Sequence, residues 1–256
     1  MSAKGELEPL VRDNIRMAAS LLLVRDREGG PEVFMVKRPG GVDFPDLHVF
    51  PGGKVDHSDH QPHLLDGVTE SEADLALGVR GGSRYWVAAI RECFEECGVL
   101  LASRDDAPVR LAAESERARF SSYRQGLIDR SLDIATLCAQ ERLRLAGDRV
   151  RYFSHWITPE QAPRRFDTRF FIAAMPDNQV TLAHHWETAG EEWVRPADAL
   201  ASHRSGRLLM IAPTLITLES LASCHSVASM MEAVAAEMHL PPLTPALREQ
   251  GMHTLR

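Results

Sequence analysis

Three glutamates recur at helical spacing in residues 85–101, which read YWVAAIRECFEECGVLL. The acids are Glu92, Glu95 and Glu96. At about 100° of rotation per residue, their carboxylates fall on one side of a helix and apolar residues fall on the opposite side. Like charges at this spacing repel by ~0.2–0.5 kcal/mol per pair, so such a stripe is costly unless a cation lies on it.

Divalent cations are the natural partners of this stripe. Hard cations prefer oxygen ligands, and Mg²⁺ in proteins is held by a few carboxylates together with substrate phosphates. Arg91 lies one turn before Glu95 and is placed to orient one of the acids. The alternative interpretation is a solvated acidic face that binds nothing.

A glycine turn upstream adds a second element. Taken with it, the segment resembles the Nudix box, whose pattern is a Gly, five residues, a Glu, seven residues and then Arg-Glu-aliphatic-x-Glu-Glu-x-Gly-aliphatic. Cys93 replaces the usual aliphatic residue. The matching residues are Gly53, Arg91, Glu92, Glu95, Glu96, Gly98 and Val99.

The first half of the box is split by an insertion. Gly53 lies 38 positions before Arg91, against 14 in the family pattern, so about 24 residues are inserted. The early Glu has no assigned counterpart: Asp59 stands there when counted from Gly53, and Ser83 stands there when counted back from Arg91. Long insertions at this point are similar to those of some peroxisomal-type coenzyme A diphosphatases. The resemblance covers roughly residues 15–205.

The resemblance implies an enzyme that hydrolyses the diphosphate of a nucleoside diphosphate linked to another moiety. It also implies Mg²⁺ or Mn²⁺ as cofactor, with Glu92, Glu95, Glu96 and the carbonyl of Gly53 as ligands and Arg91 beside them. Metals suit the reaction because they screen the phosphate charge and lower the pKa of bound water. A non-catalytic nucleotide-binding module is the alternative, but such modules typically lose box acids.

Further candidates lie outside the box. A later acid is the candidate general base, and Glu191 represents the group formed with Glu187 and Glu192. Arginines suit phosphates because the guanidinium binds two oxygens at once. The arginines expected to bind substrate are Arg38, Arg164, Arg165 and Arg169. The Asp/His-rich stretch 56–63 is either a weak zinc candidate or, more simply, a solvated loop.

Coenzyme A or acyl-coenzyme A is the expected substrate. The sequence Phe50-Pro51-Gly52-Gly53 matches the end of a motif of the coenzyme A branch, and Arg38 matches an upstream arginine, whereas Asp46 stands where that motif has Gly. ADP-ribose, dinucleotides and nucleotide sugars are the alternative substrates.

Composition and net charge exclude several classes of protein. The chain has 256 residues, 44% of them hydrophobic and 25% charged, which is typical of a globular protein. A net charge of −7 argues against non-specific binding to nucleic acid or anionic membranes. Four cysteines are too few for a disulfide framework, and no apolar run is long enough to span a membrane. We expect a cytoplasmic protein without a secretory or peroxisomal signal, as a possible homodimer.

The elements that position these residues follow from apolar patterning. Strands are expected at 15–25, 32–38, 152–158, 168–174 and 192–195, with a short apolar piece at 49–53. A helix should run from Ser83, as its N-cap, to about residue 102, and Pro196 should open another. Residues 106–147 indicate two helices, and helices are also expected near 213–222 and 226–238.

The fold class is therefore α+β, an α/β/α Nudix sandwich on a mixed sheet. We expect a Nudix domain over 1–205 and a helical C-terminal extension over 206–256. Within the domain, 106–147 forms a helical insertion. Residues 54–82, the insertion in the box, should be a mobile polar segment with a weak helix near 70–79.

Overall fold

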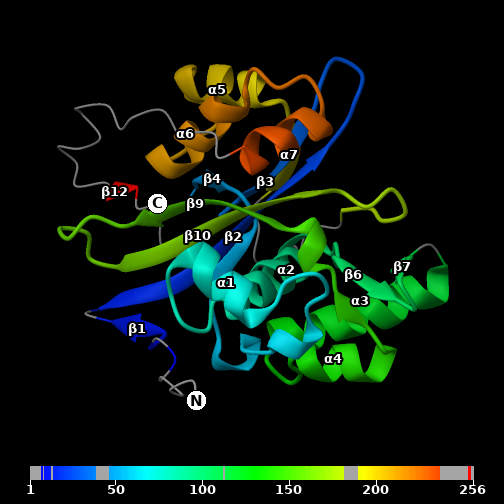
Figure 1. Cartoon of the computed structure of the whole chain (residues 1–256). Coiled ribbons are helices and arrows are strands. Elements are labelled where there is room, and N and C mark those ends of the chain that lie inside the picture. The colour runs from blue at the N-terminus through cyan, green and yellow to red at the C-terminus, as the bar shows by residue number, and fades with distance from the viewer. Residues whose placement is uncertain are drawn as a thin grey trace.

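A mixed β-sheet crosses the middle of the molecule and carries helices on both faces (Figure 1). The computed structural model describes residues 7, 9–12, 14–38, 46–111, 113–181, 190–236 and 253–254. The main path of the sheet runs β11-β3-β2-β10-β9-β12. The strands are β1 (Val11–Arg12), β2 (Ile15–Arg25), β3 (Glu32–Lys37), β4 (His48–Val49), β5 (Gly52–Lys54), β9 (Arg151–Ile157), β10 (Arg165–Ala174), β11 (Gly190–Val194) and β12 (His253–Thr254).

The parallel pair β2 and β10 forms the centre of this sheet. It runs in register from Ile15 opposite Arg165 to Val24 opposite Ala174. The other pairings of the sheet, including β2 with β3 and β5, are antiparallel. A strand covered on both faces is expected to be apolar throughout, and the LLLV run of β2 meets that expectation. The predicted mixed α+β sheet is confirmed.

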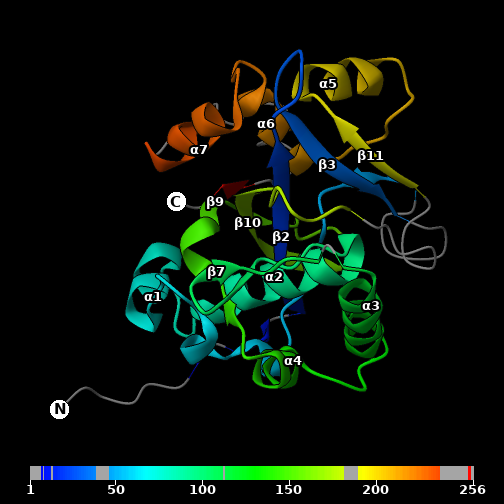
Figure 2. The same cartoon turned by 90° about the vertical axis from the view of Figure 1, so that its right-hand side faces the viewer.

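The side chains of β2 alternate between two hydrophobic cores. Leu21 and Leu23 pack in the core that contains helix α2, whereas Leu22 and Val24 pack in the core under helices α5 to α7. All four are fully buried. Figure 2 shows the resulting three layers, with α2 on one side of the sheet and α5 to α7 on the other.

Helix α2 (Ser83–Cys97) carries the acidic stripe. Its apolar stripe, including Val87, Ile90 and Phe94, is buried against the sheet, which confirms the helical spacing read from the sequence. Two details of the prediction are wrong. Gly82 rather than Ser83 is the N-cap, and the helix ends at Cys97 because Gly98 takes a left-handed conformation (φ 71°) that stops it five residues early.

The opposite face of the sheet is covered by three helices near the predicted positions, α5 (Pro196–Arg204), α6 (Ala212–Leu221) and α7 (Val227–Ala235). Pro196 opens α5 at its first turn, as predicted, since proline needs no hydrogen-bond partner there. The chain between α5 and α6 brings Ile211 to the N-cap of α6.

The segment 54–82 is packed rather than a free polar loop. It forms the short helices η1 (His57–Asp59) and η2 (Pro62–Leu64), followed by α1 (Glu70–Leu77). Leu64, Leu65, Ala73 and Leu77 join the core around α2. Their sparse apolar spacing gave little sign of this burial. The expectation of few apolar anchors is wrong, and the expected mobility of the segment stays a prediction.

Residues 106–147 contain two helices, as predicted. These are α3 (Glu114–Ile128) and α4 (Ile134–Glu141). A small sheet not predicted from sequence lies beside them, formed by β6 (Ala102–Arg104), β7 (Ala107–Pro108) and β8 (Arg144–Leu145), and a short helix η3 (Gly147–Arg149) follows. Arg124 of α3 donates to the carbonyls of Glu95 and Glu96 at 2.8 and 2.9 Å, so this segment caps the end of the acid-bearing helix.

Within the described part of the chain, no helix is long and apolar enough to cross a membrane.

Candidate active site

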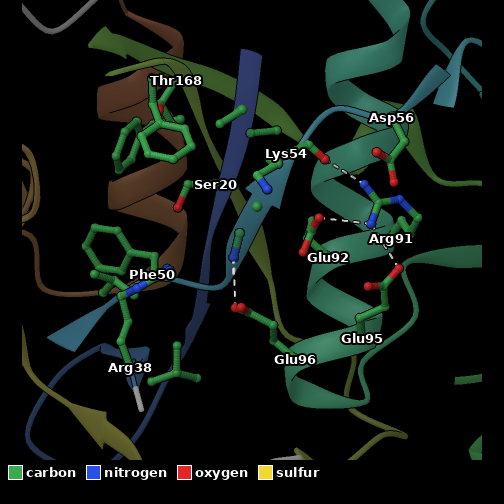
Figure 3. A pocket seen from close by; sticks show the side chains of 18 of the residues that line it. Ser20, Arg38, Phe50, Lys54, Asp56, Arg91, Glu92, Glu95, Glu96 and Thr168 are labelled. Carbon is green, nitrogen blue, oxygen red and sulfur yellow. Dashed lines mark hydrogen bonds and ion pairs between the residues drawn. The ribbon is translucent and has the colours of Figure 1, made fainter. Parts of the chain in front are cut away.

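The three glutamates of α2 face a large cleft of about 1420 Å³. The strands β2 and β5, the hairpin between β9 and β10, the start of α6 and the α3–α4 loop complete its walls. Figure 3 shows Glu92, Glu95 and Glu96 on one wall, with Ser20, Phe50 and Thr168 on the facing wall. The predicted clustering of the three acids on one side of the helix is confirmed in geometry.

Gly52 and Gly53 bring the backbone of β5 against these acids. The amide of Gly52 donates to Glu96 Oε2 at 2.9 Å. A Cβ on Gly53 would lie 2.5 Å from Glu92 Oε1, and a Cβ on Gly52 would lie 2.5 Å from the carbonyl oxygen of Ala19. At Gly52 the close neighbour is backbone, so a side chain cannot be accommodated there, whereas at Gly53 a side chain would displace the carboxylate of Glu92.

Arg91 uses all five of its N–H donors inside the protein. Its Nε and Nη2 bind the two carboxylate oxygens of Asp59 at 2.8 and 2.9 Å. Its Nη1 donates to both Glu92 Oε1 and Glu95 Oε1 at 2.9 Å, and its Nη2 also donates to the carbonyl of Lys54 at 2.9 Å. The guanidinium thus fixes two acids of the stripe relative to β5 and η1.

Asp59 is the important residue that the sequence did not assign. It is fully buried, and it lies six positions after Gly53, where the family pattern has its early Glu. That spacing was the available signal, but the inserted residues hid it. In the same stretch, Nε2 of His60 lies 3.0 Å from Oε1 of Glu70. Among the described residues, no group of three His, Cys, Asp or Glu side chains is arranged to hold a metal ion, either in this stretch or on the acidic stripe of α2.

The buried acids of the site have perturbed pKa values. Burial raises the pKa of Glu92 to about 8, even though Arg91 opposes the shift. Burial, and then the charge of Glu92, raises the pKa of Glu96 well above its usual range. Burial also raises the pKa of Asp59 against the effect of Arg91. For Arg91, burial would lower the pKa, but Glu92, Asp59 and Glu95 raise it. Arg91, and Arg38 through its charge on Glu96, face four carboxylates, so the acids outnumber the guanidinium groups here.

A divalent cation fits this donor set. The acids offer hard oxygen ligands, and the absent Cβ of Gly53 leaves its backbone beside Glu92. In the arrangement described here the carboxylates are engaged elsewhere, since Glu92 and Glu95 bind Arg91 and Glu96 binds the amide of Gly52.

The predicted arginines separate into two groups. Arg38 and Arg164 line the cleft. Arg169 lies on the other face of β10, buried, paired with Asp167 and stacked over the Tyr85 ring at 5.4 Å. Arg165 is half-buried and donates to the carbonyl of Thr158. The structure therefore does not bring Arg165 and Arg169 into the cleft.

Glu191 belongs to β11, where its backbone pairs with Val36, a residue that lines the cleft. Its side chain and all of Glu187 lie outside the described residues. Two further cations that the sequence prediction omitted, Lys54 and Arg130, line the cleft. The first lies on β5 next to the glycines, and the second lies on the α3–α4 loop.

Comparisons with known proteins agree with this fold. A solved Nudix hydrolase from Alicyclobacillus acidocaldarius superposes with a TM-score of 0.66 at 26% identity, covering 89% of this chain and 98% of that one. The acyl-coenzyme A diphosphatase NUDT19 of Xenopus laevis is 24% identical over 229 residues, and that of Gallus gallus is 26% identical over 283 residues. These alignments cover 76% and 88% of this chain, and 60% and 74% of the relatives.

The fold and the acid-bearing helix define a Nudix hydrolase, an enzyme class that generally uses divalent metals. Residues 79–221 match the family model described as the NUDT19 Nudix domain, and the chain belongs to this Nudix family. It spans about 60% of the length of the Xenopus relative.

Proposed function

We propose that this protein hydrolyses the diphosphate of coenzyme A or acyl-coenzyme A. Water would add to one phosphorus, the bridging P–O bond would break, and the products would be 3′,5′-ADP and 4′-phosphopantetheine or its acyl form. The observation that carries the proposal is the cleft in which Glu92, Glu95 and Glu96 face Gly53, in a chain whose matching family model and curated relatives are of the NUDT19 type.

Mg²⁺ or Mn²⁺ would be held by Glu92, Glu95, Glu96 and the carbonyl of Gly53. When bound, the cation would screen the diphosphate and make water a better nucleophile. Arg91 is a positioning residue in this scheme, because its bonds to Glu92, Glu95 and Asp59 hold two ligands on one side of α2. Glu191 would accept the proton of the attacking water as general base.

Arg38 and Arg164 would bind substrate phosphates from the rim of the cleft. Both line it, and guanidinium groups match phosphate oxygens in geometry and charge. Arg165 and Arg169 are dropped from this role, because neither lines the cleft among the described residues.

The test is a substrate panel with Mg²⁺ and Mn²⁺, with products resolved by mass. The panel contains coenzyme A, acyl-coenzyme A, ADP-ribose, a dinucleoside polyphosphate and a nucleotide sugar. We expect 3′,5′-ADP from the coenzyme A compounds and the highest kcat/KM for them. Fast cleavage of ADP-ribose with no cleavage of any coenzyme A compound would refute the proposed substrate while leaving the hydrolase class intact.

A further inference from the structure

The N-terminus of helix α6 opens into the cleft. Its N-cap, Ile211, and two residues of its first turn, Pro213 and Thr214, line the cleft. A helix begins with N–H groups that have no partner within the helix, and a serine, threonine, aspartate or asparagine at the N-cap usually accepts from one of them. Isoleucine has no polar side-chain atom, so α6 has no side-chain cap. The start of this ten-residue helix therefore needs an acceptor from outside it.

Two backbone amides at this helix end lack an acceptor. The first helical hydrogen bond of α6 is donated by Leu215 to the carbonyl of Ile211 at 3.0 Å. The amides of Ala212 and Thr214 precede it and have no acceptor among the described residues, and Pro213 between them has no N–H. The aligned peptide dipoles add a partial positive charge of about half a unit at this end. The start of α6 thus favours an anion.

The side chain of Thr214 is a second, independent indication of an anion. Thr214 is only 2% exposed, yet it lines the cleft, and its hydroxyl has no hydrogen-bond partner in the part of the chain that the structure describes. Buried hydroxyl groups normally have a partner, because leaving them without one is costly. Together with the two amides, this hydroxyl completes a set of three donors. Such a set suits a phosphate, whose oxygens accept several hydrogen bonds at once.

These donors are separate from the glutamates of α2. Helices α2 and α6 lie on opposite sides of the sheet (Figure 2). Helix α6 packs through Ile216 in the core that contains Trp156 and Phe170. Thr168, which alternates with Phe170 along β10, lines the cleft on that same face and adds a half-buried hydroxyl (Figure 3). A phosphate at α6 is therefore a different group from the diphosphate beside the glutamates.

We infer that the start of α6 binds a phosphate monoester of the substrate through the amides of Ala212 and Thr214 and the Thr214 hydroxyl. This inference rests on the proposed function and deepens it, because coenzyme A carries such a group, the 3′-phosphate, in addition to its diphosphate. Arg38 and Arg164 line the same cleft and would supply charge, whereas α6 supplies donors of fixed direction. Thr214 then determines specificity for a nucleotide that carries the extra phosphate.

The experiment compares 3′,5′-ADP with 5′-AMP by isothermal titration calorimetry in the presence of Mg²⁺. The two nucleotides differ only in the 3′-phosphate, and neither contains a diphosphate that the enzyme could cleave. We expect the wild type to bind 3′,5′-ADP at least about 30-fold more tightly, since each hydrogen bond to a charged group corresponds to about tenfold or more in affinity. Inorganic phosphate, titrated as a third probe, should bind more weakly than 3′,5′-ADP.

Thr214→Val is the first variant, because valine keeps the shape of the side chain and removes only the hydroxyl. We expect the preference for 3′,5′-ADP to fall by about tenfold, and kcat/KM for coenzyme A to fall by the same factor relative to dephospho-coenzyme A. Thr217→Val is the matched control. Thr217 lies about one turn further along α6 and is fully buried, away from the described lining of the cleft. Its substitution should leave both ratios unchanged.

Ile211→Asp tests the helix end itself. Aspartate is favoured at the N-cap, and its carboxylate would accept from the Thr214 amide and take the place of the phosphate. This variant should therefore melt at the same temperature as the wild type or at a higher one, and it should lose the preference for 3′,5′-ADP. A variant that is stable but no longer selective separates a binding role of this helix end from a purely structural one.

Equal affinity of the wild type for the two nucleotides, or binding of neither, would overturn the inference. A preference that survives both Thr214→Val and Ile211→Asp would also overturn it, since the 3′-phosphate would then lie elsewhere in the cleft. Inorganic phosphate bound as tightly as 3′,5′-ADP would overturn it by assigning the site to free phosphate. A preference for 3′,5′-ADP in a protein that cleaves no coenzyme A compound would support this site and overturn the proposed function instead.

Discussion

Asp59 and Arg91 are 32 positions apart in the sequence and bind each other through two hydrogen bonds of 2.8 and 2.9 Å in the interior. Asp59 is fully buried and Arg91 is 6% exposed. The pair brings η1 against α2, so that the inserted residues loop out between two parts of one site. The arrangement of Glu92 and Glu95 depends on it, because both accept from the same guanidinium.

Asp59→Asn should therefore impair both stability and catalysis. Asparagine keeps the shape but removes a charge-assisted pair, and a lost hydrogen bond to a charged group costs ~1.5–3 kcal/mol. We expect the free energy of unfolding, measured in urea, to fall by this amount. We also expect kcat to fall by at least about tenfold. Unchanged kcat and midpoint would contradict the role assigned to Asp59.

Asp66→Asn is the matched control for that substitution. Asp66 also pairs with an arginine, Arg144, at 2.8 Å, but the two side chains are 36% and 50% exposed. Exposed pairs contribute at most about 1 kcal/mol. The free energy of unfolding of this variant, measured in urea, should fall by no more than that amount, and its kcat should equal that of the wild type.

Glu95→Gln and Glu96→Gln should each lower kcat by at least about 100-fold, a loss of ~2.7 kcal/mol in the transition state. Glutamine keeps the size of the side chain and removes the negative charge that a cation needs. Steady-state kinetics with saturating Mg²⁺ measures the effect, with circular dichroism to verify folding. Near wild-type turnover in both folded variants would exclude a metal site on this stripe.

Alanine substitutions at the adjacent glycines, Gly52 and Gly53, should affect stability and catalysis differently. In Gly53→Ala the new methyl group meets the flexible end of Glu92, which can move aside, so the fold should survive while kcat drops. In Gly52→Ala the methyl group meets the backbone of Ala19 and Ser20, so stability should fall. Thermal melts and kcat for the two variants check this contrast. Equal melting temperatures for both would contradict it.

The raised pKa of Glu92 predicts how stability varies with pH in the absence of metal. Burial moves this pKa from 4.5 to about 8, so its contribution to folding is fully present below pH 4.5 and is lost as pH rises toward 8. The free energy of unfolding of the wild type, relative to Glu92→Gln, should decrease between pH 5 and pH 8. Mg²⁺ should stabilise the wild type more at pH 8, since it binds the ionised acids. A pH-independent difference between the two proteins would refute this.

Arg38 and Arg164 should distinguish coenzyme A from dephospho-coenzyme A, which differ only in the 3′-phosphate. If one of them binds that phosphate, its replacement by alanine should lower kcat/KM more for coenzyme A than for the dephospho compound. The difference should correspond to ~1.5–3 kcal/mol of lost transition-state stabilisation. Measuring both substrates on both variants identifies the contact. Equal losses on the two substrates in both variants would remove the 3′-phosphate from the role of these arginines.

Local patterns predicted the elements better than the long-range contacts. The strand 15–25 was predicted to the residue, because its continuous apolar run is typical of a buried central strand. The acids of α2 followed from helical spacing. Asp59 could not be assigned, since its partner lies across an insertion whose path only the tertiary structure defines.

The arginines show the same limit on a smaller scale. Alternate residues of a strand point to opposite faces, so in β10 Phe166, Thr168 and Phe170 line the cleft. Arg169 then belongs to the other face. Sequence gives the alternation, but which face becomes the cleft depends on how β10 packs between α2 and α7.

The most direct measurement is internal competition. Coenzyme A, octanoyl-coenzyme A and ADP-ribose are mixed at equal concentrations with the enzyme and Mg²⁺, and early products are quantified by mass. The account predicts that 3′,5′-ADP forms well before AMP, that Glu95→Gln slows formation of all products by at least about 100-fold, and that chelation of the metal abolishes them. AMP from ADP-ribose as the sole early product would contradict it.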